Sequence, residues 1–442
     1  MRLCVVAALA ILGLSSPALA SPLGSSDQAM FRGDLAHTGV YAGSPIVGAP
    51  HLMWKFAGKG RFISSPTVAG GVLYIGDTGG ELVAIDPLTG KALWTFKAHA
   101  RIASTPAVAD GVVFFGSYDG HFYALDARTG AVKWTFQNAE RRFAGTHLHG
   151  ALPAAETMPD PFDVYLSSPG VWDGKVYFGS GDGAVYALDA TSGAVRWTFK
   201  TGDVVHASPA IVAGVVYIGS WDSWFYALDA STGREKWRFK TGEDPDIHNQ
   251  VGIQSSAAVA DGLVYFGCRD SNLYALDAET GKKVWAVNNK GSWVIASPAV
   301  RNGVVYAATS DSGKFYALNG RTGAEIFSLD FKTWPMFSSP AIVGDLAYIG
   351  SHTGRLYAID LAAHKISWSF ETDGARQNLA AYTNADGTPN YRLAAPENFY
   401  DVMVAGVDKL MGIGAVLSSP TVANGVVYFG SMDGNLYALD KG

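Results

Sequence analysis

The sequence predicts an all-β protein, an eight-bladed β-propeller of four-stranded antiparallel blades that is closed by an N-terminal strand. Three observations lead to this prediction. A pattern of about forty residues recurs along the chain, and such a period in a β-rich sequence is typical of propellers. Short apolar runs alternate with Gly- and Asp-containing turn signals. The last copy of the pattern lacks its final strand, whereas an isolated strand precedes the first copy.

Each copy of the repeat contains a Tyr-Ala-Leu-Asp core or a close variant, and a Trp follows most cores on the next predicted strand. These cores end at Asp86, Asp126, Asp189, Asp229, Asp277, Asn319, Asp360 and Asp440. An Asp at a turn can bond its own backbone, and a large indole can be buried between blades. Because both residues recur in nearly every copy, we interpret them as structural rather than catalytic.

The second copy shows how one blade should be built from the axis outward. Asp110-Gly111 is a strong signal for a tight hairpin turn between the first two strands. Tyr118-Asp119-Gly120 marks the next turn, and Gly130 can take the positive φ that the third turn needs. The four predicted strands begin near 106, 112, 121 and 132.

The two ends of the repeat region complete each other. The last copy stops at Gly442, before any Trp strand, and residues 51–57 form a Trp strand with no blade in front of it. We expect strand 51–57 to pair into the last blade, because closure of the ring removes an exposed sheet edge. Residues 51–442 should therefore form a single propeller.

The N-terminus is typical of a secretory signal peptide over residues 1–20. It has a basic Arg2, an apolar run over 3–14, and Ala18-Leu19-Ala20 as a cleavage signal. Cleavage after Ala20 would leave an N-terminal segment, 21–50, and a periplasmic or secreted protein. Ser21 stands where a lipoprotein would carry a cysteine, so we expect no lipid anchor. No later apolar run is long enough to predict a transmembrane span, and we expect a monomer.

Composition excludes some classes of partner and chemistry. The formal net charge is −6 and the chain has no basic run, which disfavours a nucleic-acid partner. Cys268 is the one cysteine after the signal, so no internal disulfide can form in the mature chain. We interpret Cys268 as a small core residue rather than a nucleophile.

The repeats resemble the pyrroloquinoline quinone (PQQ) repeat, with the pattern G-x-V-Y-x-G-S-x-D-G-x-L-Y-A-L-D-A-x-T-G-x-x-x-W. Residues 425–440 follow this pattern almost letter for letter, and the resemblance covers nearly all of 54–442. It implies the propeller fold and two groups of relatives. One group comprises quinoprotein dehydrogenases, which hold PQQ and Ca²⁺ on the propeller axis. The other is the non-catalytic propeller subunit of the outer-membrane β-barrel assembly machinery.

The chain departs from both groups. Quinoprotein alcohol dehydrogenases stack PQQ on a ring of two adjacent cysteines, and no such pair is present here. The chain also has no C-x-x-C-H haem motif. The assembly subunit would carry a lipid-modified cysteine at the mature N-terminus, which is Ser21 here. These departures favour a binding or scaffold function over PQQ- and Ca²⁺-dependent oxidation of an alcohol or sugar, which stays the alternative.

Three long connections interrupt the regular repeat, at 137–166, 241–254 and 371–417. Each joins the outer strand of one blade to the inner strand of the next, so all three should lie on one face and form a rim around the mouth of the axis. Loops this long in a compact domain are usually functional or disordered. We therefore expect the function to reside on this rim.

The first two connections contain the candidate metal ligands and part of the candidate catalytic set. His and carboxylate side chains are ligands for transition metals and for Ca²⁺. Plain surface histidines are the alternative interpretation of His147 and His149. The candidate metal ligands are His147, His149, Asp246 and Asn249, and the candidate catalytic carboxylates are Asp244, Asp246 and Asp270.

The candidate ligand contacts lie at the mouth of the axis, where the residue at a given repeat position differs from blade to blade. Arg pairs with carboxylates and Trp stacks on planar rings, so this mixture suits a small planar, polar or anionic ligand. Solvated rim residues are the alternative interpretation of some of them, and a periplasmic protein is the alternative partner. The candidates are Arg61, Arg101, His206, Trp221, His248, Asn249, Gln254, Arg269, Trp293 and His352.

Overall fold

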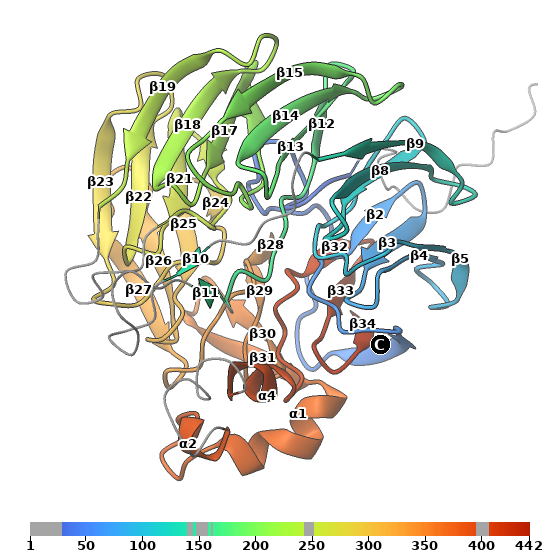
Figure 1. Cartoon of the computed structure of the whole chain (residues 1–442). Coiled ribbons are helices and arrows are strands. Elements are labelled where there is room, and N and C mark those ends of the chain that lie inside the picture. The colour runs from blue at the N-terminus through green and yellow to red at the C-terminus, as the bar shows by residue number, and fades with distance from the viewer. Residues whose placement is uncertain (1–28, 139–144, 147–157, 161, 243–251, 395–405) are drawn as a thin grey trace, which may run out of the picture.

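The computed structural model describes residues 29–138, 145–146, 158–160, 162–242, 252–394 and 406–442. Eight four-stranded antiparallel sheets are arranged as blades around a central axis (Figure 1). The predicted eight-bladed propeller is therefore confirmed. The strands nearest the axis are almost fully buried, whereas the outermost strands alternate between exposed and half-buried residues.

The first four blades follow one another in sequence. Blade 1 comprises β2 (Thr67–Ala69), β3 (Val72–Gly76), β4 (Glu81–Ile85) and β5 (Ala92–Lys97). Blade 2 comprises β6 (Ala107–Ala109), β7 (Val112–Gly116), β8 (His121–Asp126) and β9 (Val132–Gln137). Blade 3 comprises β12 (Gly170–Trp172), β13 (Lys175–Gly179), β14 (Ala184–Asp189) and β15 (Val195–Lys200). Blade 4 comprises β16 (Ala210–Val212), β17 (Val215–Gly219), β18 (Trp224–Asp229) and β19 (Glu235–Lys240).

The remaining blades continue around the axis. Blade 5 comprises β20 (Ala258–Ala260), β21 (Leu263–Gly267), β22 (Asn272–Asp277) and β23 (Lys283–Asn288). Blade 6 comprises β24 (Ala299–Arg301), β25 (Val304–Ala308), β26 (Lys314–Asn319) and β27 (Glu325–Asp330). Blade 7 comprises β28 (Ala341–Val343), β29 (Leu346–Gly350), β30 (Arg355–Asp360) and β31 (Lys365–Glu371). Blade 8 comprises β32 (Thr421–Ala423), β33 (Val426–Gly430), β34 (Asn435–Asp440) and β1 (His51–Ala57).

The connections carry the other elements. The first long connection contains the short strands β10 (Gly145–Thr146) and β11 (Met158–Pro159), which pair with each other. The third contains α1 (Asp373–Asn378), the 3₁₀ helix η1 (Leu379–Tyr382), α2 (Tyr391–Ala394) and α4 (Val407–Met411). No helix among the described residues is both long and apolar enough to cross a membrane.

The N-terminal strand closes the ring, as predicted. β1 pairs antiparallel with β34, so that His51 lies opposite Asp440 and Ala57 lies opposite Asn435. The Trp54 indole nitrogen then donates to the carbonyl oxygen of Pro87 in blade 1, at 3.0 Å. Five other indoles make the same bond to the following blade, at 2.7–3.1 Å: Trp94, Trp134, Trp197, Trp237 and Trp285. The Trp368 indole of blade 7 donates instead to the carbonyl of Ile46, in the N-terminal segment before β1, at 2.8 Å. This regularity supports the structural interpretation of the Trp series.

A closed ring of eight hydrogen bonds joins the inner strands at the axis. A buried Ser or Thr lies just before each inner strand, and its backbone amide donates to the hydroxyl of the corresponding residue in the next blade, at 2.8–3.1 Å. The last bond runs from the Ser419 amide back to the Ser65 hydroxyl. The ring residues are Ser65, Thr105, Ser168, Ser208, Ser256, Ser297, Ser339 and Ser419. Each hydroxyl thus satisfies a buried amide that has no sheet partner.

Residues 29–46 form a strap that crosses the axis on the side of this ring opposite to the long connections. Ala29 exchanges two backbone hydrogen bonds with Val108 of β6. The strap carbonyls of Leu35, Ala36, Thr38 and Gly39 then accept from the inner strands of blades 4, 5, 6 and 7, at 2.7–2.9 Å. The buried Arg32 side chain donates to the carbonyl oxygens of Pro340 and Pro298, at 2.6 and 3.1 Å. The strap closes this end of the axis.

His37 of the strap is buried, with 1% of its surface exposed. Burial, together with the nearby Arg32 charge, lowers its pKa from 6.5 to about 3. The unfolded chain therefore binds a proton below pH 6.5 that the folded chain does not bind until about pH 3. Stability due to neutral His37 is complete above pH 6.5 and is lost as the pH falls from 6.5 towards 3.

We expect the His37→Phe variant to lose less stability on acidification than the native chain. Because one protonation site is removed, its free energy of unfolding between pH 6 and 4 should fall less steeply, by about 1.4 kcal/mol per pH unit. Urea unfolding at several pH values measures this slope. His99→Phe, at an exposed histidine, controls for the substitution itself. Equal slopes in the native chain and the His37→Phe variant would contradict the conclusion that the folded chain keeps His37 unprotonated in this pH range.

Candidate functional site

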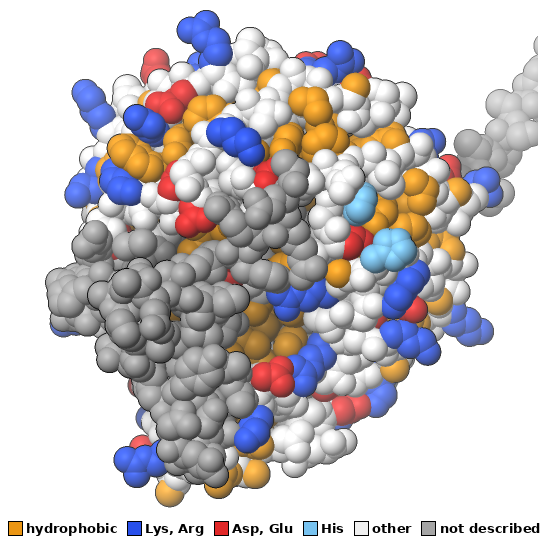
Figure 2. All heavy atoms as spheres, in the orientation of Figure 1, with side chains coloured by type: hydrophobic (Ala, Val, Ile, Leu, Met, Phe, Trp, Pro, Cys, Tyr) orange, Lys and Arg blue, Asp and Glu red, His pale blue; other side chains and the backbone are white. Residues whose placement is uncertain are grey.

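The long connections and the turns between second and third strands share one face of the propeller. The Gly242 amide of the second long connection donates to Asp270 in the β21–β22 turn, and the Gly374 amide of the third donates to Asp433 in the β33–β34 turn. Figure 2 views this face, which is hollowed near its middle. Hydrophobic surface lies inside the hollow, and basic and acidic side chains lie at its edge. We call the mouth of the axis on this face the funnel.

Several sequence-predicted residues lie outside the described part of the chain. These are His147, His149, Asp244, Asp246, His248 and Asn249, and their roles stay predictions. Within the described residues, no three His, Cys, Asp or Glu side chains lie close enough to hold a metal ion.

The funnel contains part of the first long connection. The Phe162 carbonyl accepts from the Gln254 side chain at 2.9 Å, and the Tyr165 hydroxyl donates to the carbonyl of Leu417 at 3.0 Å. The Tyr118 hydroxyl in turn donates to the Tyr165 carbonyl at 3.2 Å. Residues 162–166 are thus bonded to blades 2, 5 and 8, and they lie where the sequence predicts a ligand.

Arg269 is held at the centre of this arrangement. Its guanidinium lies 3.9 Å from the ring centre of Trp293 and 4.6 Å from that of Trp221, so it is placed between the two indoles. Its Nη1 donates to Asp160 Oδ2 at 2.7 Å, and both side chains are 1% exposed. Cation–π contacts and a buried ion pair therefore stabilise the charge.

A second buried pair links the same connection to blade 4. His206 Nδ1 lies 2.6 Å from Asp163 Oδ1, and both side chains are fully buried. The structure therefore brings together the candidates His206, Trp221, Gln254, Arg269 and Trp293. It groups them around the chain's own Asp160, Phe162 and Asp163.

Asp270 and Cys268 lie beside this group in blade 5. Asp270 is buried and accepts from the Tyr274 hydroxyl and the Gly242 amide. Asp119, Asp182, Asp222 and Asp433 accept from Tyr123, Tyr186, Tyr226 and Tyr437 in the same way. This repetition supports a structural role for Asp270. Burial raises the pKa of the Cys268 thiol, which fits an unreactive core residue.

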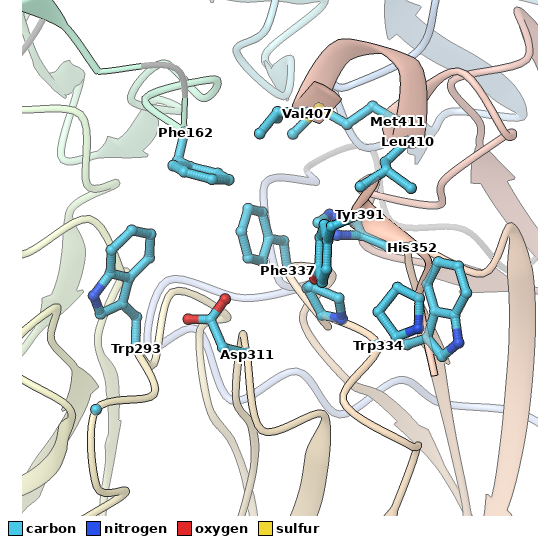
Figure 3. Close-up of a pocket in the computed structure, with 13 residues that line it drawn as sticks. Phe162, Trp293, Asp311, Trp334, Phe337, His352, Tyr391, Val407, Leu410 and Met411 are labelled. Atoms are coloured by element: carbon cyan, nitrogen blue, oxygen red, sulfur yellow. The ribbon is translucent and has the colours of Figure 1, made fainter. Parts of the chain in front are cut away.

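An aromatic cavity of about 340 Å³ lies beside the filled funnel, between blades 6 and 7 and the third connection. In Figure 3, Phe162 and Trp293 lie on one side, Trp334 and His352 lie on the other, and α4 lies above them. Its other lining residues are Gly291, Asp311, Pro335, Phe337, Pro389, Tyr391, Val407, Leu410 and Met411. The cavity combines parts of the first and third connections, which are about 200 residues apart in the chain. No local sequence pattern relates such distant segments. Of the lining residues, only Trp293 and His352 are among the predicted ligand contacts.

His352 is the polar group on the buried wall of this cavity. It is 7% exposed, and burial lowers its pKa from 6.5 to about 3, so the ring is neutral near pH 7. The Phe337 ring packs edge-on against it with centres 4.6 Å apart. Its Nε2 has no hydrogen-bond partner among the described residues. A neutral imidazole nitrogen of this kind can donate to or accept from a ligand.

A basic cavity of about 710 Å³ lies on the other side of α4, next to blades 8, 1 and 2. Lys59, Arg61 and Arg101 line it, together with Asp408 of α4. Arg61 Nη1 lies 2.6 Å from Asp408 Oδ1, and the Arg101 guanidinium lies 4.0 Å from the ring centre of Tyr118. Val407 and Met411 line both cavities, so α4 forms the wall between them. The predicted contacts Arg61 and Arg101 thus lie apart from the other candidates.

We expect Asp160→Asn to destabilise the fold strongly, because it removes the carboxylate that neutralises the buried Arg269. The free energy of unfolding should fall by about 3–5 kcal/mol, and the double variant Asp160→Asn/Arg269→Met should recover part of the loss. Urea unfolding measures both. Asp173→Asn removes an exposed partner of Lys175 and should cost less than about 1 kcal/mol. Equal costs for the two single variants would contradict a structural ion pair in the funnel.

The comparisons with known proteins agree with the propeller fold. The sequence model of the family described as outer membrane protein assembly factor BamB matches residues 50–166 and 163–291, which is more than half of the chain. A search of the curated proteins finds no significant match.

Solved structures resemble the whole propeller. BamB from Moraxella catarrhalis is 19% identical, covers 89% of this chain and 100% of its own, and has a TM-score of 0.65. The quinohemoprotein alcohol dehydrogenases from Comamonas testosteroni and Pseudomonas putida are 16% and 15% identical. They cover 93% and 94% of this chain and 80% of their own chains, with TM-scores of 0.66 and 0.69. At these identities the likeness establishes the fold alone, whereas the sequence match establishes the family: the chain belongs to the family of PQQ-repeat propellers described by outer membrane protein assembly factor BamB.

Proposed function

We propose that this propeller is an exported binding protein whose aromatic cavity holds a small planar molecule. The observation that carries the proposal is the 340 Å³ cavity, which Phe162, Trp293, Trp334 and other aromatic residues line at the rim. Ligand cavities usually measure about 300–1,000 Å³ and are mostly apolar with a few placed polar groups. This cavity meets each of these criteria. The signal-like residues 1–20 support export, and the same rim offers a surface to a periplasmic protein as the alternative partner.

The size of the cavity indicates a ligand with two or three fused rings. An engineered apolar cavity of about 150 Å³ binds benzene. A volume about twice as large suits a molecule about twice as large. Aromatic walls favour a flat ligand, because offset and edge-on ring contacts add to the free energy of burial.

The polar wall indicates one hydrogen-bonding group on that ligand. The His352 ring is neutral near pH 7, and its buried Nε2 can gain a hydrogen bond from a heteroatom of the ligand. Asp311 lies at the exposed side of the cavity, where its carboxylate accepts from the Ser310 hydroxyl at 2.9 Å. Figure 3 shows this carboxylate directed towards the space between Trp293 and Phe337. An anionic ring substituent would therefore be disfavoured at this end.

We expect the native protein to bind quinoline more tightly than naphthalene, because quinoline adds a ring nitrogen that can pair with His352. Titration calorimetry with both probes measures this preference, which should be about three- to tenfold. His352→Phe should remove the preference, and Leu410→Trp should fill the cavity and abolish binding of both probes. Leu93→Trp is the matched control, because Leu93 is exposed on β5, away from the cavity. Unchanged binding in Leu410→Trp would contradict the proposed site.

The alternative function, PQQ- and Ca²⁺-dependent oxidation of an alcohol or sugar, fits the described residues less well. A quinone on the axis needs a flat space beside an aromatic platform. Here the Arg269 guanidinium lies between the indoles of Trp221 and Trp293, and Asp160 and Phe162 lie beside it. The space is therefore filled by side chains of the chain itself.

We expect titration of the mature protein with PQQ to give no Ca²⁺-dependent heat. Displacing Arg269 from its two indoles and from Asp160 would leave a buried charge without compensation, which opposes quinone binding. The titration is run with Ca²⁺ and with a chelator. Tight binding that requires Ca²⁺ would overturn the proposal in favour of the dehydrogenase, and a screen of alcohols and sugars with an artificial electron acceptor would follow.

A further inference from the structure

We infer that the basic cavity is a second site, which binds the carboxylate or phosphate group of a small anion through Arg61 and Arg101. The inference does not depend on the aromatic cavity, because the two spaces are separated by α4. Three cationic side chains and one carboxylate line the basic cavity: Lys59, Arg61, Arg101 and Asp408. Its volume of about 710 Å³ accommodates a small metabolite with room for bridging water.

The two arginines interrupt the repeat at one defined position. Arg61 and Arg101 each stand five residues before the proline that begins an inner strand, Pro66 and Pro106. The corresponding residues of blades 3 to 8 are Val164, Val204, Gly252, Trp293, Pro335 and Ala415. Arginine therefore occurs at this position in two neighbouring blades and in no other. If the fold itself required a cation at this position, arginine or lysine would be expected in every blade. Its presence in two neighbouring blades indicates a function at that place on the rim.

Arg101 is held in place before any ligand arrives. Its guanidinium stacks on the ring of Tyr118 at 4.0 Å, and its carbonyl accepts from the Tyr118 amide at 3.0 Å. Tyr118 is itself buried, and its hydroxyl is bonded to the carbonyls of Asp163 and Tyr165. Stacking fixes the plane of the guanidinium, and its N–H groups lie in that plane. Such a fixed fork suits a carboxylate or phosphate group.

The backbone around Arg61 is fixed as well. Its amide donates to the Thr78 hydroxyl at 2.8 Å, and its carbonyl accepts from the Thr78 amide at 2.9 Å. The Lys59 amide donates to the buried Asp77 at 3.0 Å. Two short turns thus hold Lys59 and Arg61 on one wall of the cavity. Little backbone entropy therefore remains to be lost at these residues when an anion binds.

Asp408 shows that the Arg61 guanidinium can receive a carboxylate from the cavity side. The two groups are 2.6 Å apart, and the Asp408 side chain is 69% exposed. An ion pair this exposed contributes little to stability, so a dissolved anion can compete for Arg61 at small cost. The contrast with the fully buried Arg269–Asp160 pair is direct, because that pair is inaccessible to a ligand.

The test is a calorimetric titration of the mature protein with citrate and, separately, with inorganic phosphate at low ionic strength. We expect at least one of these probes to bind, and a higher salt concentration to weaken the binding. Arg61→Gln and Arg101→Gln should each weaken it by about tenfold or more. Asp408→Asn should strengthen it by about three- to fivefold, because it removes the competing carboxylate. A preference for citrate or for phosphate distinguishes a carboxylate ligand from a phosphorylated one.

The matched control is Arg238→Gln. Arg238 stacks on Trp224 with 4.6 Å to the ring centre, as Arg101 stacks on Tyr118, but it lies on β19 outside the cavity. The Arg238→Gln variant should bind the probes with the same affinity as the native protein. Melting temperatures of all variants show whether each still folds. The inference is overturned if neither probe binds to the native protein or to Asp408→Asn at about 10 mM. It is also overturned if Arg61→Gln, Arg101→Gln and Arg238→Gln have the same affinity for the probe.

Discussion

The structure depends on the closed ring of hydroxyl-to-amide bonds at the propeller axis. The inner strands have no sheet partner on the side facing the axis, and an unsatisfied buried amide costs about 1–3 kcal/mol. The eight Ser and Thr hydroxyls satisfy the amides just before each inner strand, and the bond from Ser419 to Ser65 closes the series. Because every hydroxyl accepts from one neighbour while its own amide donates to the other, a missing blade would leave a donor and an acceptor unpaired. The ring therefore requires the series of blades to close on itself around the axis.

That narrow axis determines where function can lie. The strap of residues 29–46 closes one end, with Arg32 bonded to the carbonyls of blades 6 and 7. At the other end, the first long connection fills the funnel through the pairs Arg269–Asp160 and His206–Asp163. Open volume is consequently displaced from the axis to the rim, where the third connection adds α4 and divides it into an aromatic and a basic cavity. The insertions thus fill the funnel and build the cavities from the same chain segments.

The fold could be predicted from the sequence because the repeat defines the blades. Contacts made by segments outside the repeat could not be predicted in this way. Strand 51–57 could be assigned to the last blade because its Trp pattern matched the strand missing after Gly442. The strap of residues 29–46 could not be predicted, because it bonds to backbone amides of the inner strands. Backbone amides are present at nearly every residue, so no sequence pattern marks these contacts. His206, Arg269 and Trp293 were placed at the funnel because they stand at positions defined by the repeat. Their partners Asp160 and Asp163 could not be assigned, since Arg269 lies 109 residues from Asp160 and no local pattern relates two such positions.

Comparison of equivalent positions among the blades separates structural from functional residues. Asp270 binds the tyrosine of its own blade just as Asp119 and Asp222 do, so its burial reflects the repeat. Arg269 has no such counterpart: the corresponding positions in blades 2 and 4 hold Tyr118 and Trp221. Its charge is compatible with burial because Asp160 is supplied by a connection that is itself irregular. An arginine between two indoles and a carboxylate on the facing loop therefore form one unit, because each neutralises the buried charge of the other. A relative that binds a planar cofactor in this space would have to differ at both positions together.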